Sequence, residues 1–277
     1  MEALGYEFMQ NAILAGLLAG IACGIVGCLV VVNRIVFLSG GIAHATYGGI
    51  GLAIFLGFSP LLGAVGFSVV MALAIGFISL KNKTRADTVV GVLWALGMGF
   101  GIIMLDLAPG YNTDVMSYLF GSILAVPRSD IFLILLLNIV IFIVMGLFYK
   151  DFLALSYDEE FASLMGVPVK FLYILLMILI ALCVVVVIRV VGLILVIALF
   201  TISPYISEQY SKSLKSMMLL SVILNCVFTL VGLWLSYILN LTSGATIIMV
   251  AGFFFFLSLV FCRFFKKKCK EASTSQG

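Results

Sequence analysis

Long apolar runs separated by short turns constrain this chain more than any other feature. An α-helix needs about 20 residues to cross the hydrocarbon core of a bilayer, and most of the runs approach or exceed that length. The alternating ten-residue strand pattern of a membrane β-barrel is not seen. We therefore predict an all-α, polytopic membrane protein with eight to nine transmembrane helices. The candidate spans cover residues 8–32, 41–57, 60–80, 88–106, 131–149, 171–187, 190–205, 216–238 and 244–264.

Composition excludes the soluble classes. Of the 277 residues, 64% are hydrophobic and 10% charged, which is too little charge to cover a water-facing surface. The six cysteines form no CxxC pair, so neither a disulfide framework nor a thiolate zinc cage is indicated. We expect one transmembrane domain over residues 1–265. The basic and polar tail over 266–277 is typical of a cytoplasmic flank and not of a nucleic-acid site.

Positive charges predict how the chain crosses the membrane. If nine spans alternate strictly, five basic clusters fall on one side, which the positive-inside rule identifies as the cytoplasm. The N-terminus is then outside and the C-terminus inside. Arg189, near an outer turn, is the exception, and we expect it to be buried in protein and paired. The clusters are Arg34, residues 81–85, Lys150 with Lys170, Lys212 with Lys215, and the C-terminal lysines.

His44 is the only histidine, and it lies in the glycine-dense apolar stretch 34–57. Two interpretations are open at this point. The ring can be a packed side chain whose nitrogens are satisfied by neighbouring backbone, or it can serve whatever crosses the membrane here. The rest of the chain decides between them.

Two loops stand out by length. The outer loop, 107–130, carries acidic residues at its ends and centre, so it can be a lid, a docking surface or a plain surface loop. Its carboxylates, with the one just before it, are Asp106, Asp114 and Asp130.

The inner loop, 150–170, predicts a short helix that begins after Ser156 or Asp158. Glu159 and Glu160 fall in its first turn, where the helix dipole favours negative charge. Gly166 and Pro168 end the helix. A short amphipathic helix between two spans suits a groove in a soluble partner, and the alternative is a helix lying in the lipid interface. Its acidic start and its shortage of basic residues favour the partner.

Catalytic motifs are missing from the sequence. There is no GxxxxGK[ST] phosphate loop, no HExxH and no second histidine for a catalytic triad, so we do not expect an enzyme. Energy for active transport must come from an ion gradient or from another subunit. Few membrane-embedded carboxylates are available to relay ions, which favours the subunit.

Five motifs in one order resemble the permease subunits of the zinc/manganese/iron class of ABC importers, over nearly the whole chain. FLSGGIAHATYGGIGLA (37–53) resembles the family's FxGDAxSHAxLPGVALA. Thr113-Asp114-Val115 with LFGSILAV (119–126) resembles its TDL…LFGSILAV loop, and DEEFASLMGVPV (158–169) its cytoplasmic DEExAxxxGVPV. VGLILVIALFTISPYIS (191–207) is similar to VGxLLVxALLxxPAATA, and LSYILNLTSGATI (235–247) to LSYxLxxxxGATI.

The resemblance implies a homodimer of permeases in a bacterial or archaeal inner membrane, in contact with lipid. Two cytoplasmic ATP-binding subunits and an extracytoplasmic metal-binding protein would complete the assembly. Asp106 and Asp114 would lie near the docked binding protein, and metal would pass between the subunits along the second span.

The same resemblance assigns a role to the inner helix, within 156–168. It corresponds to the coupling helix that sits in a groove of the ATPase. The residues implied in coupling are Asp158, Glu159, Glu160 and Gly166.

Departures from the family pattern concern the cargo. The family's aspartate four residues before the histidine would share its helical face, but here the position is Gly40. A carboxylate that some members place on the eighth span falls at Ser221. His44 is then left with neutral oxygen donors, a set compatible with Zn²⁺ and less so with Mn²⁺. The candidate path residues are His44, Ser39, Thr46, Ser203, Ser221 and Asn225, and helix packing is the alternative role of the last two.

Three functions follow from these observations. The first is an ATP-driven importer of a divalent transition metal, zinc before manganese or iron, with no permanently bound cofactor. The second keeps the ABC assembly but carries a metal chelate or a cobalamin-like ligand, as the missing aspartate permits. The third is a stand-alone secondary carrier driven by its own ion gradient.

Overall fold

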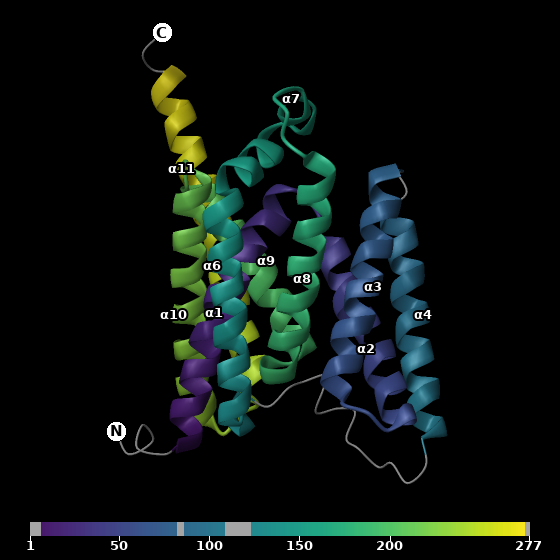
Figure 1. Ribbon diagram of the computed structural model, residues 1–277. Coiled ribbons are helices and arrows are strands. Elements are labelled where there is room, and N and C mark those ends of the chain that lie inside the picture. The colour runs from purple at the N-terminus through teal and green to yellow at the C-terminus, as the bar shows by residue number, and fades with distance from the viewer. Residues whose placement is uncertain (1–6, 82–85, 109–122, 275–277) are drawn as a thin grey trace.

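The computed structural model describes residues 7–81, 86–108 and 123–274, and within these ranges the chain is helical with no strand (Figure 1). This confirms the all-α prediction. The helices are α1 (Glu7–Val32), α2 (Val36–Leu56), α3 (Pro60–Lys81), α4 (Ala86–Leu107), η3 (Ile123–Ala125), α6 (Arg128–Tyr157), α7 (Glu159–Leu164), α8 (Val169–Val191), α9 (Leu193–Tyr210), α10 (Leu214–Leu239) and α11 (Ser243–Thr274).

Eight helices of the described chain are long and apolar enough to cross a membrane: α1, α3, α4, α6, α8, α9, α10 and α11. The remaining long helix, α2, has 21 residues but is diluted by glycines, Ser39, His44 and Thr46. It packs alongside α3 and α4 as part of the bundle (Figure 1). The only histidine of the chain therefore lies on the one long helix of the described residues that is not among these eight.

The long helices run up and down in one bundle. α1 begins at the end opposite α7, and α11 finishes at the end from which α7 projects (Figure 1). Helices α2, α3 and α4 form one side, α6, α10 and α11 the other, and α8 joins the sides by contacts with both α3 and α6. Which end faces the cytoplasm stays a prediction.

Glycines let α1 approach α10 closely. Gly16, Gly20 and Gly24 recur every four residues and so occupy one face of α1. A Cβ at Gly24 would lie 2.9 Å from the Val222 backbone, and one at Gly20 would lie 3.3 Å from Asn225. Helix packing without side chains between the backbones is the main way that small residues stabilise membrane bundles.

Close packing at glycines also holds α2 against α3 and α4. A Cβ at Gly51 would overlap the Gly101 carbonyl, and one at Gly49 would overlap that of Gly63. A Cβ at Gly97 would come within 2.8 Å of Ala45 Cα. Helices α2, α3 and α4 therefore meet backbone to backbone and hold His44 on a tightly packed helix.

Helix α6 is longer than the span predicted for residues 131–149, since it runs from Arg128 to Tyr157. Lys150 marked the start of the predicted inner loop, but neither it nor the following residues break a helix. Phe152 and Leu155 are buried in the extension and anchor it to the core. The inner connection is accordingly reduced to the short helix α7 and its two turns.

Candidate functional site

The His44 ring is held by its own helix. Its Nδ1 lies 2.8 Å from the carbonyl oxygen of Gly40, one turn earlier. A carbonyl only accepts hydrogen bonds, so Nδ1 must carry the hydrogen and the neutral ring presents its lone pair at Nε2. Within residues 7–81, 86–108 and 123–274, Nε2 makes no hydrogen bond. The neighbouring backbone therefore satisfies one ring nitrogen and leaves the other available.

Trp94 of α4 lies face to face with this ring. The two ring centroids are 4.0 Å apart and the planes differ by 29°. Both side chains are half-buried. Trp94 is in turn fixed by its Nε1, which donates to Met98 Sδ at 3.2 Å, and by Phe37, whose ring centroid is 6.0 Å away.

Gly40 has open space where a side chain would be. A Cβ built there meets no atom within 4 Å, whereas one on the adjacent Gly41 would overlap Val90. Because residues four apart share a helical face, the open space at Gly40 and the His44 ring lie along one side of α2. The position of the family's aspartate is therefore empty but sterically available.

The other two polar candidates on α2 bond to their own helix. Ser39 Oγ donates to Val36 O and Thr46 Oγ1 donates to Ile42 O, both at 2.8 Å. Thr46 also lines a pocket of about 150 Å³ between α2, α3 and α8, together with Ser59 and Arg189. It thus lies two residues from His44 but points toward a different part of the bundle.

Ser221 and Asn225 lie on the face of α10 that packs against α1. Asn225 Nδ2 donates to Gly20 O and to Leu199 O, each at 3.2 Å, so it links α10 to both α1 and α9. Ser221 is fully buried, with the Cys28 thiol beside it, and Ser203 of α9 is 1% exposed. The bonds of Asn225 are those of a packing residue.

The structure therefore separates the candidate path residues into two groups. The first group, Ser39, His44 and Thr46, lies on α2, and of these His44 stacks on Trp94 of α4. The second group, Ser203, Ser221 and Asn225, lies among α1, α9 and α10. Among the described residues, no three His, Cys, Asp or Glu side chains are close enough to hold one metal ion together. Within the described residues, His44 is therefore not part of a cluster of three such side chains.

Asp158 is the N-cap of α7, which is one of the two start positions that the sequence left open. Its Oδ1 accepts from the backbone N–H of Glu160 at 2.9 Å and of Phe161 at 3.0 Å. Gly166 ends the helix in the left-handed region with φ +84°, where glycine has no steric penalty. The helix is thus defined at both ends by residues of the DEEFASLMGVPV motif.

An apolar surface faces outward from α7. Leu164 is 86% exposed, Met165 69% and Phe161 59%, while Ala162 is buried against the bundle. A depression of about 480 Å³ lies between Glu160 on α7, Leu80 at the end of α3 and Lys170 on α8. The surface of α7 is therefore apolar at its tip and polar beside α3.

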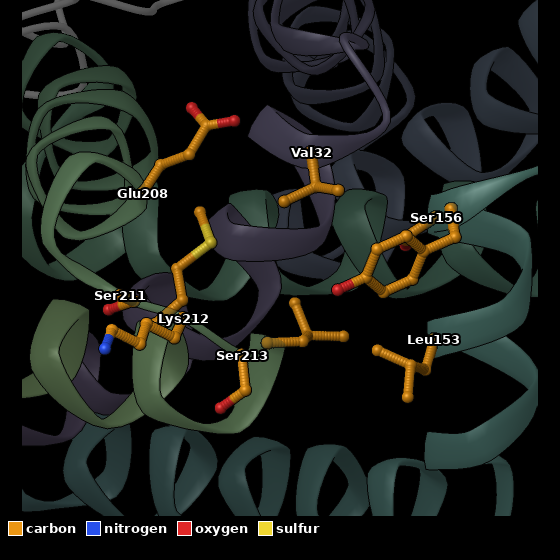
Figure 2. Close-up of a pocket in the computed structure, with 10 residues that line it drawn as sticks. Val32, Leu153, Ser156, Glu208, Ser211, Lys212 and Ser213 are labelled. Carbon is orange, nitrogen blue, oxygen red and sulfur yellow. The ribbon is translucent and has the colours of Figure 1, made fainter. Parts of the chain in front are cut away.

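A second pocket, of about 190 Å³, lies at the same end of the bundle (Figure 2). Figure 2 shows Glu208, Ser211 and Lys212 from the end of α9 and the turn after it, with Val32 from the end of α1 nearby. Leu153 and Ser156 of α6 line the opposite side. This pocket holds one acidic side chain, which makes it a poor cation site by itself.

At the other end of the bundle, Asp106 is exposed near the end of α4. Asp114 lies outside the described residues. Asp130, in the first turn of α6, is 6% exposed and pairs with Arg189 of α8, with Arg189 Nε 2.9 Å from Asp130 Oδ2. The pairing expected for Arg189 is thus present, although its own side chain is 40% exposed.

Sequence reasoning missed Trp94 and the partner of Arg189. Trp94 lies in an apolar run where an aromatic residue is ordinary, and only the contact of α2 with α4 brings it to His44. Asp130 was noted as a loop carboxylate, 59 positions from Arg189. An intramembrane arginine with an acidic residue near the start of another span is the signal that could have paired them.

Together, a bundle of apolar helices, one oriented histidine and a short projecting helix define a multi-pass membrane transport protein. The chain belongs to the ABC 3 transport family, whose sequence profile matches residues 5–262. The match confirms the resemblance carried by the five motifs. It also identifies a membrane permease of an ABC transport system, located in a bacterial-type inner membrane.

Relatives cover almost the whole chain. An uncharacterized membrane protein of Synechocystis is 52% identical over 95% of this chain and 94% of its own length. The manganese transport system membrane protein MntC of Listeria monocytogenes is 33% identical over 92% and 91%. The solved structure of PsaBC from Streptococcus pneumoniae in complex with Fab has a TM-score of 0.83 at 32% identity, covering 93% of each chain.

Proposed function

We propose that this chain is the permease subunit of an ATP-driven importer of divalent transition metal ions. Family membership supports the ABC class. The observation that best supports a metal cargo is the geometry of the His44 ring. Its Nδ1 donates to the Gly40 carbonyl, which leaves Nε2 as a ligand. A metal-bound histidine usually donates its other N–H to a carbonyl or carboxylate in this way.

Zinc is the first candidate cargo. An imidazole nitrogen with neutral oxygens suits Zn²⁺, whereas Mn²⁺ favours carboxylates, and Gly40 and Ser221 supply none. Manganese is the second candidate, because a relative that matches over most of its length is named as a manganese transport protein. Iron stays a third. A weak site serves transport, since a transported ion must both bind and leave.

Helix α7 is proposed to dock in a groove of a cytoplasmic ATP-binding subunit. Its exposed Phe161, Leu164 and Met165 supply the apolar contact, and an interface core of this kind carries most binding energy. Helix α7 contacts α6 and α8, and α8 packs against both α3 and α2. Nucleotide-driven movement of α7 is proposed to reach α2, which carries His44, through α8.

The opposite end is proposed to receive an extracytoplasmic metal-binding protein near Asp106 and Asp114. A homodimer would bring a second His44 toward the first across a two-fold axis. Two imidazole nitrogens and several neutral oxygens would then line one path, whereas one copy of the chain has a single histidine.

Purification and reconstitution test this function. The chain, expressed with its native neighbours and isolated in mild detergent, is expected to retain an ATP-hydrolysing subunit. Placed in liposomes, the complex should accumulate free Zn²⁺ or Mn²⁺ only when ATP is supplied on the α7 side. Accumulation driven by an ion gradient without ATP would identify a secondary carrier, and uptake of a metal chelate in place of free ions would identify a chelate importer.

A further inference from the structure

We propose that Trp94 is a positioning residue for the cargo ion, because it holds the His44 imidazole in the orientation in which Nε2 meets the ion. This inference rests on the proposed function, since it assigns Nε2 as the ligand. It concerns α4, a helix that none of the motifs of the resemblance includes.

Two contacts restrain the His44 ring in independent ways. The hydrogen bond from Nδ1 to the Gly40 carbonyl, at 2.8 Å, fixes the tautomer and one edge of the ring. The stack on Trp94, at 4.0 Å between centroids and 29° between planes, restrains rotation of the ring about its χ2 angle. Neither contact alone sets both tautomer and plane. Together they hold the Nε2 lone pair in a single orientation.

Trp94 can act as a fixed surface because it is itself held. Its indole N–H donates to Met98 Sδ at 3.2 Å on the same helix. Phe37, on α2, packs against it at 6.0 Å with the planes inclined by 49°. Close backbone packing of α2 on α4, with Gly97 against Ala45, keeps the spacing of the two rings constant.

The stack also favours the loaded site over the empty one. A cation bound at Nε2 withdraws electron density from the imidazole, so the ring becomes more positive. The indole face of tryptophan, which attracts cations more strongly than other aromatic side chains, then stabilises that ring. Replacing Trp94 by an aliphatic residue should remove this attraction together with the ring restraint. Because outer contacts of a metal ligand are worth roughly 10-fold in affinity or more, we expect a loss of about that size.

The first experiment uses the two tryptophans of the chain. Trp234→Phe leaves Trp94 as the only one, and Trp234 lies on the exposed side of α10. In the purified full-length permease chain, titrated Mn²⁺ should quench Trp94 emission saturably, because its unpaired electrons act over short distances. His44→Ala in the same background should abolish the saturable quenching. Saturable quenching that persists without His44 would overturn the proposal.

The second experiment compares Trp94→Phe with Trp94→Leu in ATP-driven metal uptake. Phenylalanine keeps a ring to stack and should stay within about 3-fold of the parent, whereas leucine should raise the KM roughly 10-fold at unchanged maximal rate. A merely structural role would lower the amount of folded complex and the maximal rate in both variants. Equal KM values for Phe and Leu would overturn the positioning role.

Failure of the proposed function is distinguishable from failure of this inference. If the wild-type complex does not transport metal but the His44-dependent quenching is present, the function is wrong and the position of the ion stands. If the wild-type complex transports metal and Trp94→Leu has the parent's KM, the function stands and Trp94 does not position the ion.

Discussion

Arg189 Nε on α8 lies 2.9 Å from Asp130 Oδ2 in the first turn of α6, although the residues are 59 positions apart. The carboxylate is nearly buried and the guanidinium reaches the surface. The pair therefore joins two long helices at the end of the bundle opposite α7. It also neutralises the buried Asp130 carboxylate, which would be costly without a partner.

Removing Arg189 should destabilise the bundle. Arg189→Ala leaves a buried carboxylate unpaired, so we expect the free energy of unfolding to fall by about 2–3 kcal/mol. Thermal unfolding in detergent measures this. The double variant Asp130→Asn with Arg189→Ala, which leaves no charge, should recover most of the loss, and Asp130→Asn alone completes the cycle. Simple addition of the two single effects would argue against a stabilising pair.

A carboxylate at Gly40 should change the cargo. The open space there accepts a side chain on the same face as His44. Gly40→Asp is therefore expected to raise the ratio of manganese to zinc uptake, because Mn²⁺ favours carboxylate ligands. Gly40→Asn, of the same shape and without charge, is the control and should leave the ratio near that of the parent. A folded Gly40→Asp protein with an unchanged ratio would show that cargo does not pass this face.

Packing of α2 predicts which glycines are replaceable. Gly51→Ala would push a methyl group into the Gly101 backbone, so we expect a loss of about 1–3 kcal/mol in stability. Gly66→Ala on α3 meets open space and should be neutral or stabilising by up to about 1 kcal/mol. Melting temperatures of the two variants in one detergent measure the difference. Equal losses would contradict the close approach of α2 and α4.

The exposed tip of α7 should decide binding of the ATPase. Leu164→Asp places a charge at the most exposed apolar position of the helix, and we expect roughly 10-fold weaker retention of the ATP-binding subunit during purification. Leu164→Met keeps the apolar contact and serves as the control. Co-purification of the subunit at the parent's ratio with Leu164→Asp would place the docking surface elsewhere.

The fold was largely predictable because apolar run length depends on local composition. All nine spans appear as long helices, and Asp158 and Gly166 bound α7 through local backbone chemistry. The end of α6 was missed because Lys150 indicated the start of a loop, whereas the burial of Phe152 extends the helix past it.

The site was less predictable because its contacts join distant segments. His44 was recognisable as the only histidine of the chain, but its relation to Trp94 depends on how α2 lies against α4, 50 residues later. The roles of Asn225 and Thr46 likewise depend on which helix each one faces. Asn225 bonds to the backbones of α1 and α9, and Thr46 bonds to its own helix.

The central claim is that cargo metal meets His44 on its way through the permease. The most direct measurement is ATP-driven uptake of radioactive zinc and manganese by the reconstituted complex carrying His44→Ala. We predict at least a roughly 10-fold fall in uptake, as expected for loss of a metal ligand, with the ATP-binding subunit retained at the parent's ratio. Unchanged uptake of zinc, manganese and iron by a fully assembled complex would contradict the claim.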